Sequence, residues 1–240
     1  MPDRVTILSS RRAYEFAPDA IRLTMLTTIE VQRVIRDAFG FHQSTVGTPM
    51  ETFGPVPPTL PPGVVFDNGS MVTEGEQIVP IRFLIFESQR IVVDVAASSD
   101  TIDMFWSHLI EITAGLQAPD GNPVIGTPTR TLDYSQISAH LQFRYESLLP
   151  QPLINVEKGL ASHFPDSASW SFIPSISLTF SQTGGAFSST PQHRIFRLEP
   201  RAGERIDAQI YFSSAPFPSR SHLWYLEQIE SGLSGSNSSA

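Results

Sequence analysis

Residues 82–114 read RFLIFESQRIVVDVAASSDTIDMFWSHLIEITA, and this stretch decides the fold class. Two apolar runs of strand character, residues 78–87 and 90–97, are joined by a very short link, which predicts a β-hairpin. Ser99 or Asp100 can then cap a helix whose apolar residues recur every three or four positions. The stretch therefore predicts a β-hairpin–helix unit, with two antiparallel strands and a helix that covers one face of their sheet.

A second unit of the same kind follows in the other half of the chain. The run Arg82-Phe-Leu-Ile-Phe-Glu87 corresponds to Arg194-Ile-Phe-Arg-Leu-Glu199, and the strand that begins at Arg90 corresponds to the one that begins at Arg205. Residues 109–116 correspond to residues 226–233. Internal duplication is one interpretation, and the alternative is that any two such units share this pattern. The sequence predicts an α+β fold: a mainly antiparallel sheet built from two duplicated β-hairpin–helix halves, with the helices packed on one face.

The other elements follow from periodicity and turn residues. The expected strands are residues 4–8, 20–25, 64–73, 131–147, 169–181, 193–199 and 205–213, and the expected helices are residues 28–39, 100–114 and 219–231. A turn is expected at Asp67-Asn68-Gly69. In the last strand we expect Ile210 and Phe212 to point inward, and we expect Trp106 and Trp224 to be core anchors.

The turn-rich segment 117–130 divides the chain. We expect a first α+β half at residues 1–120, which includes a Pro-rich loop at 48–63, and a second half at 121–234. Residues 235–240 read as a flexible tail, and the two halves are expected to share one core. Six prolines in residues 48–63 exclude a regular strand there.

Composition excludes several classes of protein. The chain has no cysteine, which removes disulfides and cysteine-based metal sites. Its net charge of −8 lies in residues 41–120, where such a surface repels phosphate backbones and argues against nucleic-acid binding. No apolar run reaches the about 20 residues of a membrane-spanning helix. With no signal-peptide pattern at the start, we expect a cytoplasmic location and no membrane association.

Motifs for catalysis or cofactor binding are not found. No two of the six histidines have metal-motif spacing; they are His42, His108, His140, His163, His193 and His222. No Gly-x-Ser-x-Gly elbow and no dinucleotide-binding glycine pattern occurs. The sequence therefore predicts no cofactor, no metal and no catalytic residue, and an enzyme is the less favoured class.

Two functional hypotheses follow. The first is a non-catalytic protein-interaction or assembly module, which self-associates or binds another protein subunit through edge strands. The second is an enzyme or a binder of a small anionic ligand, with a cleft between the halves lined by Arg82, Arg144, Arg194 and His193. Nucleic-acid binding through Arg194, Arg197, Arg201 and Arg205 ranks last, because strand alternation places Arg194 and Arg197 on opposite faces.

Overall fold

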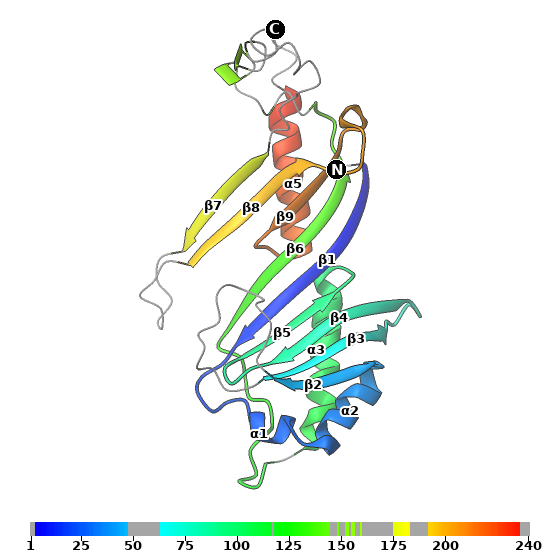
Figure 1. Ribbon diagram of the computed structural model, residues 1–240, viewed down its shortest axis with the longest axis vertical. Coiled ribbons are helices and arrows are strands. Elements are labelled where there is room, and N and C mark those ends of the chain that lie inside the picture. The colour runs from blue at the N-terminus through cyan, green and yellow to red at the C-terminus, as the bar shows by residue number, and fades with distance from the viewer. Residues whose placement is uncertain are drawn as a thin grey trace. The chain divides into compact units, whose positions relative to one another are not determined.

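The computed structural model describes residues 3–47, 63–116, 118–144, 175–182 and 192–235, with a few positions between 148 and 159. Within these residues the chain has an α+β fold with a large antiparallel sheet and four α-helices (Figure 1). The strands are β1 (Asp3–Glu15), β2 (Gln43–Gly47), β3 (Gly63–Val72), β4 (Ile78–Phe86), β5 (Arg90–Val95), β6 (Arg130–His140), β7 (Ile176–Gln182), β8 (Gln192–Pro200) and β9 (Ile210–Ala215). The helices are α1 (Leu23–Leu26), α2 (Ile29–Phe39), α3 (Ser99–Ala114) and α5 (Ser219–Gly235).

The chain divides into two compact units. The larger comprises Leu8–Ser135 with Phe217–Ser219, and the smaller comprises Met1–Ile7, Gln136–Pro216 and Arg220–Ala240. The strand order in the larger unit is β2-β3-β4-β5-β1-β6, and in the smaller unit, which includes the first residues of β1, it is β1-β6-β9-β8-β7. Strands β2 and β7 are therefore the edge strands of their units.

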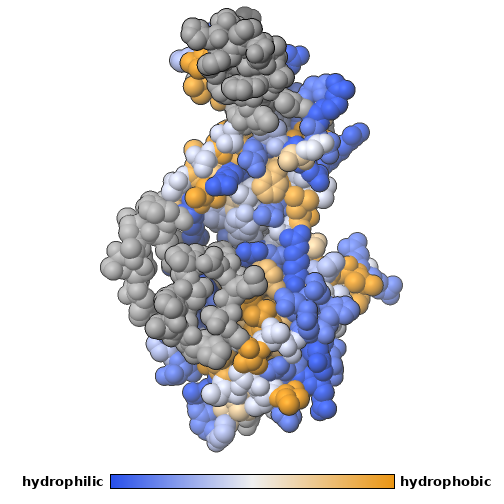
Figure 2. All heavy atoms as spheres, in the orientation of Figure 1, coloured by the Kyte–Doolittle hydropathy of each residue, from blue (hydrophilic) through white to orange (hydrophobic). Residues whose placement is uncertain are grey.

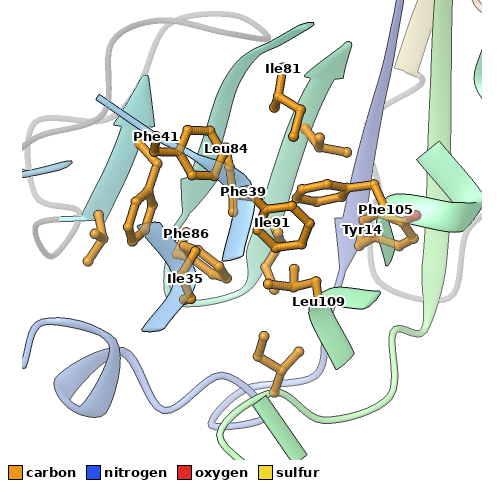
Figure 3. Packing of buried hydrophobic residues seen from close by; sticks show 14 of the residues in the cluster. Tyr14, Ile35, Phe39, Phe41, Ile81, Leu84, Phe86, Ile91, Phe105 and Leu109 are labelled. Carbon is orange, nitrogen blue, oxygen red and sulfur yellow. The ribbon is translucent and has the colours of Figure 1, made fainter. Parts of the chain in front are cut away.

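The core of the larger unit combines aromatic and aliphatic side chains (Figure 3). Helix α2 contributes a buried stripe of Val31, Ile35 and Phe39, and Gly40 ends the helix in the left-handed conformation with φ 56°. The ring of Phe39 lies 4.5 Å from that of Phe105 on α3, measured between centroids. These helical side chains belong to one buried cluster with alternate residues of β3, β4 and β5, which follows from the two-residue period of strands.

The predicted hairpin of residues 78–97 is confirmed, because β4 and β5 pair antiparallel. The backbone N–H of Glu87 donates to the Arg90 carbonyl oxygen at 2.8 Å. The Arg90 guanidinium also donates to both Glu87 carboxylate oxygens, at 2.6 and 3.0 Å. This bidentate ion pair stabilises the turn between β4 and β5.

Two predictions for the larger unit are wrong. The turn expected at residues 67–69 lies inside β3, where Asn68 adopts φ 56° and the strand continues to pair with β4 on both sides. The β3–β4 turn instead begins at Thr73, whose N–H donates to the Gln77 carbonyl oxygen at 3.0 Å. The strand expected at 20–25 is not formed: residues 23–25 belong to α1, and Ile21 makes a single β-bridge, to Ile125.

The last predicted strand is also displaced. Residues 206–208 form a 3-10 turn and Gln209 has φ 54°, so that β9 begins only at Ile210. In β9 Tyr211 and Ser213 are buried, whereas Ile210 and Phe212 are only half-buried, and the last two residues of the strand are both buried. A one-residue shift exchanges the two faces of a strand. Similarly, β6 ends at His140 and not at 147.

Some predictions concern residues that lie outside the described part. They include the Pro-rich loop, of which only Gly63 is described, and residues 236–240 of the tail. The division into halves at residue 120, and a core shared between those halves, stay predictions. In the part of the chain that the structure describes, no helix is long and apolar enough to cross a membrane.

Candidate functional site

The structure places the four predicted ligand-binding residues in different units. Arg82 lies on β4 of the larger unit, where one guanidinium nitrogen donates to the Leu8 carbonyl oxygen at 3.1 Å. Arg144 is exposed just beyond β6, and Arg194 is half-buried on β8, both in the smaller unit. His193 precedes Arg194 on β8. A site formed by all four residues stays a prediction.

The arginines of the nucleic-acid hypothesis have internal contacts. Arg201 donates to the Ser138 hydroxyl at 3.1 Å. Arg205, which is exposed, donates to both carboxylate oxygens of Asp207, at 2.9 and 2.8 Å. The Arg205–Asp207 pair neutralises one of the positive charges that would attract a phosphate backbone.

A polar cluster on Arg12 joins three elements of the larger unit. The Arg12 Nε donates to Asp133 on β6 at 2.7 Å, and a second nitrogen donates to Asp103 on α3. Burial by itself would lower the pKa of Arg12, but the hydrogen bonds that Arg12 donates to these carboxylates raise it above its usual value. Arg12 is therefore firmly charged, and its contacts hold α3 against β1 and β6.

Tyr14 lies beside this cluster. Its ring stacks on Trp106 with centroids 3.8 Å apart, and the Arg12 guanidinium carbon lies 5.9 Å from the Tyr14 centroid. The hydroxyl is buried near Arg12 without a hydrogen bond of normal geometry. Burial raises the pKa of Tyr14 to about 12. The phenol therefore keeps its proton at neutral pH and does not act as a general base. The cluster fits a structural role better than a catalytic one.

A second charged group lies on the opposite face of the same strand. Arg11 Nε lies 2.9 Å from a carboxylate oxygen of Asp94, whose side chain is only 1% exposed, and Arg82 lies 3.7 Å from the other oxygen. The Arg11 guanidinium also covers the Phe83 ring at 4.9 Å. Burial raises the pKa of Asp94, while the two arginines act against that shift. The Asp94 carboxylate balances one of the two arginine charges, and its contacts join β1, β4 and β5.

The smaller unit holds a serine–histidine pair. The Ser213 hydroxyl lies 2.8 Å from His222 Nε2, and both residues are buried. Ser213 donates its own proton to the Arg197 carbonyl oxygen at 2.7 Å, so Nε2 acts as the donor toward Ser213. A nucleophilic serine needs the reverse, with the hydroxyl donating to the imidazole. Burial lowers the pKa of His222 to about 3, so the pair is a neutral packing contact.

One surface hollow has the size of a small-ligand site. It encloses about 510 Å³ between residues 18–27 and the β4–β5 turn at Ser88 and Gln89. Its lining includes two charged residues, Asp19 and Arg22, and Arg22 is paired with Asp120 at 2.7 Å. The Thr27 hydroxyl donates to the Thr24 carbonyl oxygen. No group of three or more potential metal ligands occurs among the described residues.

Edge strand β7 of the smaller unit has a different character. Residues 175–182 read SISLTFSQ and contain no charge and no proline. Among the described strands β8 is the one that pairs with β7, which places β7 at the end of the strand order. Leu178 is 41% exposed, and Trp224 on α5 of the same unit is 59% exposed, which makes the prediction of Trp224 as a core anchor wrong. In the view of Figure 2, apolar residues lie interspersed with hydrophilic ones.

No protein-family model matches this sequence, and no curated protein matches it. The sequence predicts pairing through edge strands, but it does not single out β7. The sequence does contain an indication of β7 as a pairing surface, because an uncharged strand-like run of seven residues is unusual at a sheet edge. The Arg11-Arg12 pair also carried a signal, since neighbouring strand residues face opposite sides of a sheet.

Proposed function

We propose that this protein is a non-catalytic interaction or assembly module that binds a protein strand along the edge of β7. The observation that carries the proposal is the uncharged composition of this edge strand together with the exposure of Leu178. Natural edge strands are usually protected by lysine, proline, bulges or a covering element. An edge without such side chains suits strand addition, in which backbone hydrogen bonds supply affinity.

The polar groups support a role without catalysis. In the Arg12 and Asp94 clusters the charges pair with one another, and Ser213 donates to a backbone carbonyl. Each arrangement stabilises packing between elements and presents no activated nucleophile to solvent. A protein partner and the cytoplasmic location expected from the sequence belong to this proposal.

Duplication of the hairpin–helix plan, with the helices on one face, is a further part of the proposal. Strand β9 and helix α5 begin 120 positions after β5 and α3, and the facing pair Phe86–Ile91 in one hairpin has the same place as Pro200–Tyr211 in the other. The residue correspondence expected from sequence differs, because Arg205 lies in the turn and not at the start of a strand. At the two helix starts, the N–H of Ser99 and that of Ser219 each donate to the other's hydroxyl, at 3.0 and 3.1 Å.

Replacing Leu178 with lysine is expected to weaken strand addition at β7 strongly. The change places a charge on the edge, while the long aliphatic stem of lysine keeps contact with the strand surface. Amide hydrogen exchange of the β7 peptide is the measurement, in the purified protein at rising concentration and in cell extract. We expect wild-type β7 amides to become protected as a partner binds, and those of Leu178→Lys to exchange as fast as in dilute solution.

Val46→Lys is the matched control. Val46 is likewise an exposed apolar residue on an edge strand, β2 of the larger unit, and the substitution changes net charge equally. It should leave β7 protection intact. Unprotected β7 amides in wild-type protein under every condition would refute the proposed function.

A further inference from the structure

We propose that the strand bound at β7 is β7 of a second copy of this chain, paired antiparallel about a twofold axis at Leu178. This inference rests on the function proposed above and names its partner. In this register Leu178 faces its own counterpart, Ile176 faces Phe180, and Ser177 faces Thr179.

In this register residues 176–180 of β7 face residues of the same chemical type in the second copy. Leu178 lies opposite the buried Phe196 of β8 and Ile176 lies opposite Leu198, so both point to the apolar face of the sheet. Self-pairing about Leu178 therefore brings Ile176, Leu178 and Phe180 only against apolar residues. Ser177 and Thr179, both exposed, meet on the other face, where hydroxyl side chains form favourable cross-strand pairs.

The second edge strand does not offer this match. Strand β2 has five residues, QSTVG, and its twofold pairing about Thr45 would place Ser44 against the apolar Val46. The Ser44 hydroxyl also already donates to the Gln32 side chain at 2.9 Å. Self-pairing is therefore favoured at β7.

The charge of the chain predicts opposite effects of salt for a second copy and for a basic partner. The chain carries −8 overall, with the acidic excess in residues 41–120, whereas residues 175–182 carry none. Two copies repel each other at long range but meet at an uncharged contact, so screening by salt strengthens their association. A basic partner attracted by the acidic stretch would bind more weakly as salt rises.

The test uses two single-cysteine variants of the full chain, Ser177→Cys and Thr179→Cys. Because the native chain has no cysteine, any disulfide formed must join these positions. In the proposed register residue 177 of one copy faces residue 179 of the other, within the 4.4–6.8 Å Cα separation that disulfides need. The same residue in the two copies lies on a diagonal, about 7–8 Å apart.

Under mild oxidation, a mixture of the two variants should give a disulfide-linked dimer, and each variant alone should stay mainly unlinked. The linked fraction should rise with added sodium chloride. Efficient linking of Thr179→Cys alone would show a shifted register, and no linking, or linking that falls with salt, would equally overturn the inference. If β7 amides are protected only in cell extract, the second copy is excluded while the proposed function survives.

Discussion

Replacing Gly69 with alanine is expected to lower the free energy of unfolding by about 3 kcal/mol. A Cβ atom at this position would lie 2.5 and 2.6 Å from two ring carbons of Phe41 and 2.8 Å from the Phe39 carbonyl oxygen. Phe41 cannot turn aside easily, because its ring is buried against Phe39 and Phe66. The carbonyl of Phe39 belongs to the end of α2, so relief of the overlap must displace the helix from β3.

Gly75→Ala is the matched control in the neighbouring β3–β4 turn. The nearest atom to its added Cβ is the Thr73 hydroxyl oxygen at 4.0 Å, and we expect a change within about 0.5 kcal/mol. Urea unfolding followed by tryptophan fluorescence measures both variants. A cost at Gly69 no larger than that at Gly75 would contradict the close packing of α2 on β3.

The second large effect is acid destabilisation through His222. The pKa of this residue is about 3 in the folded chain because burial disfavours the charged ring. An unfolded chain regains the ordinary value near 6.5. Below pH 6.5 the unfolded state therefore binds a proton that the folded state does not, and stability falls as pH falls. The loss is about 1.4 kcal/mol per pH unit, or about 2 kcal/mol at pH 5.

Thermal or urea unfolding from pH 7 to pH 4 tests this effect against His222→Gln, which keeps a donor near Ser213 but does not titrate. Subtracting the profile of the variant removes the contribution of Asp94, whose raised pKa acts in the opposite sense. His42→Gln, at an exposed position, should retain the wild-type acid sensitivity. Parallel profiles for wild type and His222→Gln would show that the imidazole is not buried in a neutral form.

Elements with strong local signals could be predicted from sequence. The stripe Val31, Ile35 and Phe39 with its glycine stop predicts α2, and the short link at Glu87 predicts the β4–β5 hairpin. Asp67-Asn68-Gly69 is a local signal that tertiary pairing overrides: Asn68 takes the left-handed conformation of a turn, yet β3 continues. Here the turn-forming residues correctly predict a left-handed backbone angle, but they do not predict whether the chain reverses direction.

The candidate sites depended on contacts that no local pattern encodes. Arg12 meets Asp103 and Asp133 across 91 and 121 positions, and Ser213 meets His222 only because β9 and α5 pack together. The turn at residues 206–208 shifted the register of β9, so alternation counted from Arg205 assigned the wrong face. Edge position likewise depends on strand order, which places β7 beside β8 alone among the described strands.

Light scattering of the purified full chain over a range of concentrations tests self-association through β7 most directly. The account predicts that the mass rises from 26.5 kDa toward twice that value as concentration and salt increase. Leu178→Lys should raise the dimer dissociation constant about tenfold or more, since it sets two like charges directly opposite each other at the pairing centre. Val46→Lys should leave the constant unchanged. A mass of 26.5 kDa at every concentration and salt would contradict self-association, as would equal dimerisation of wild type and Leu178→Lys.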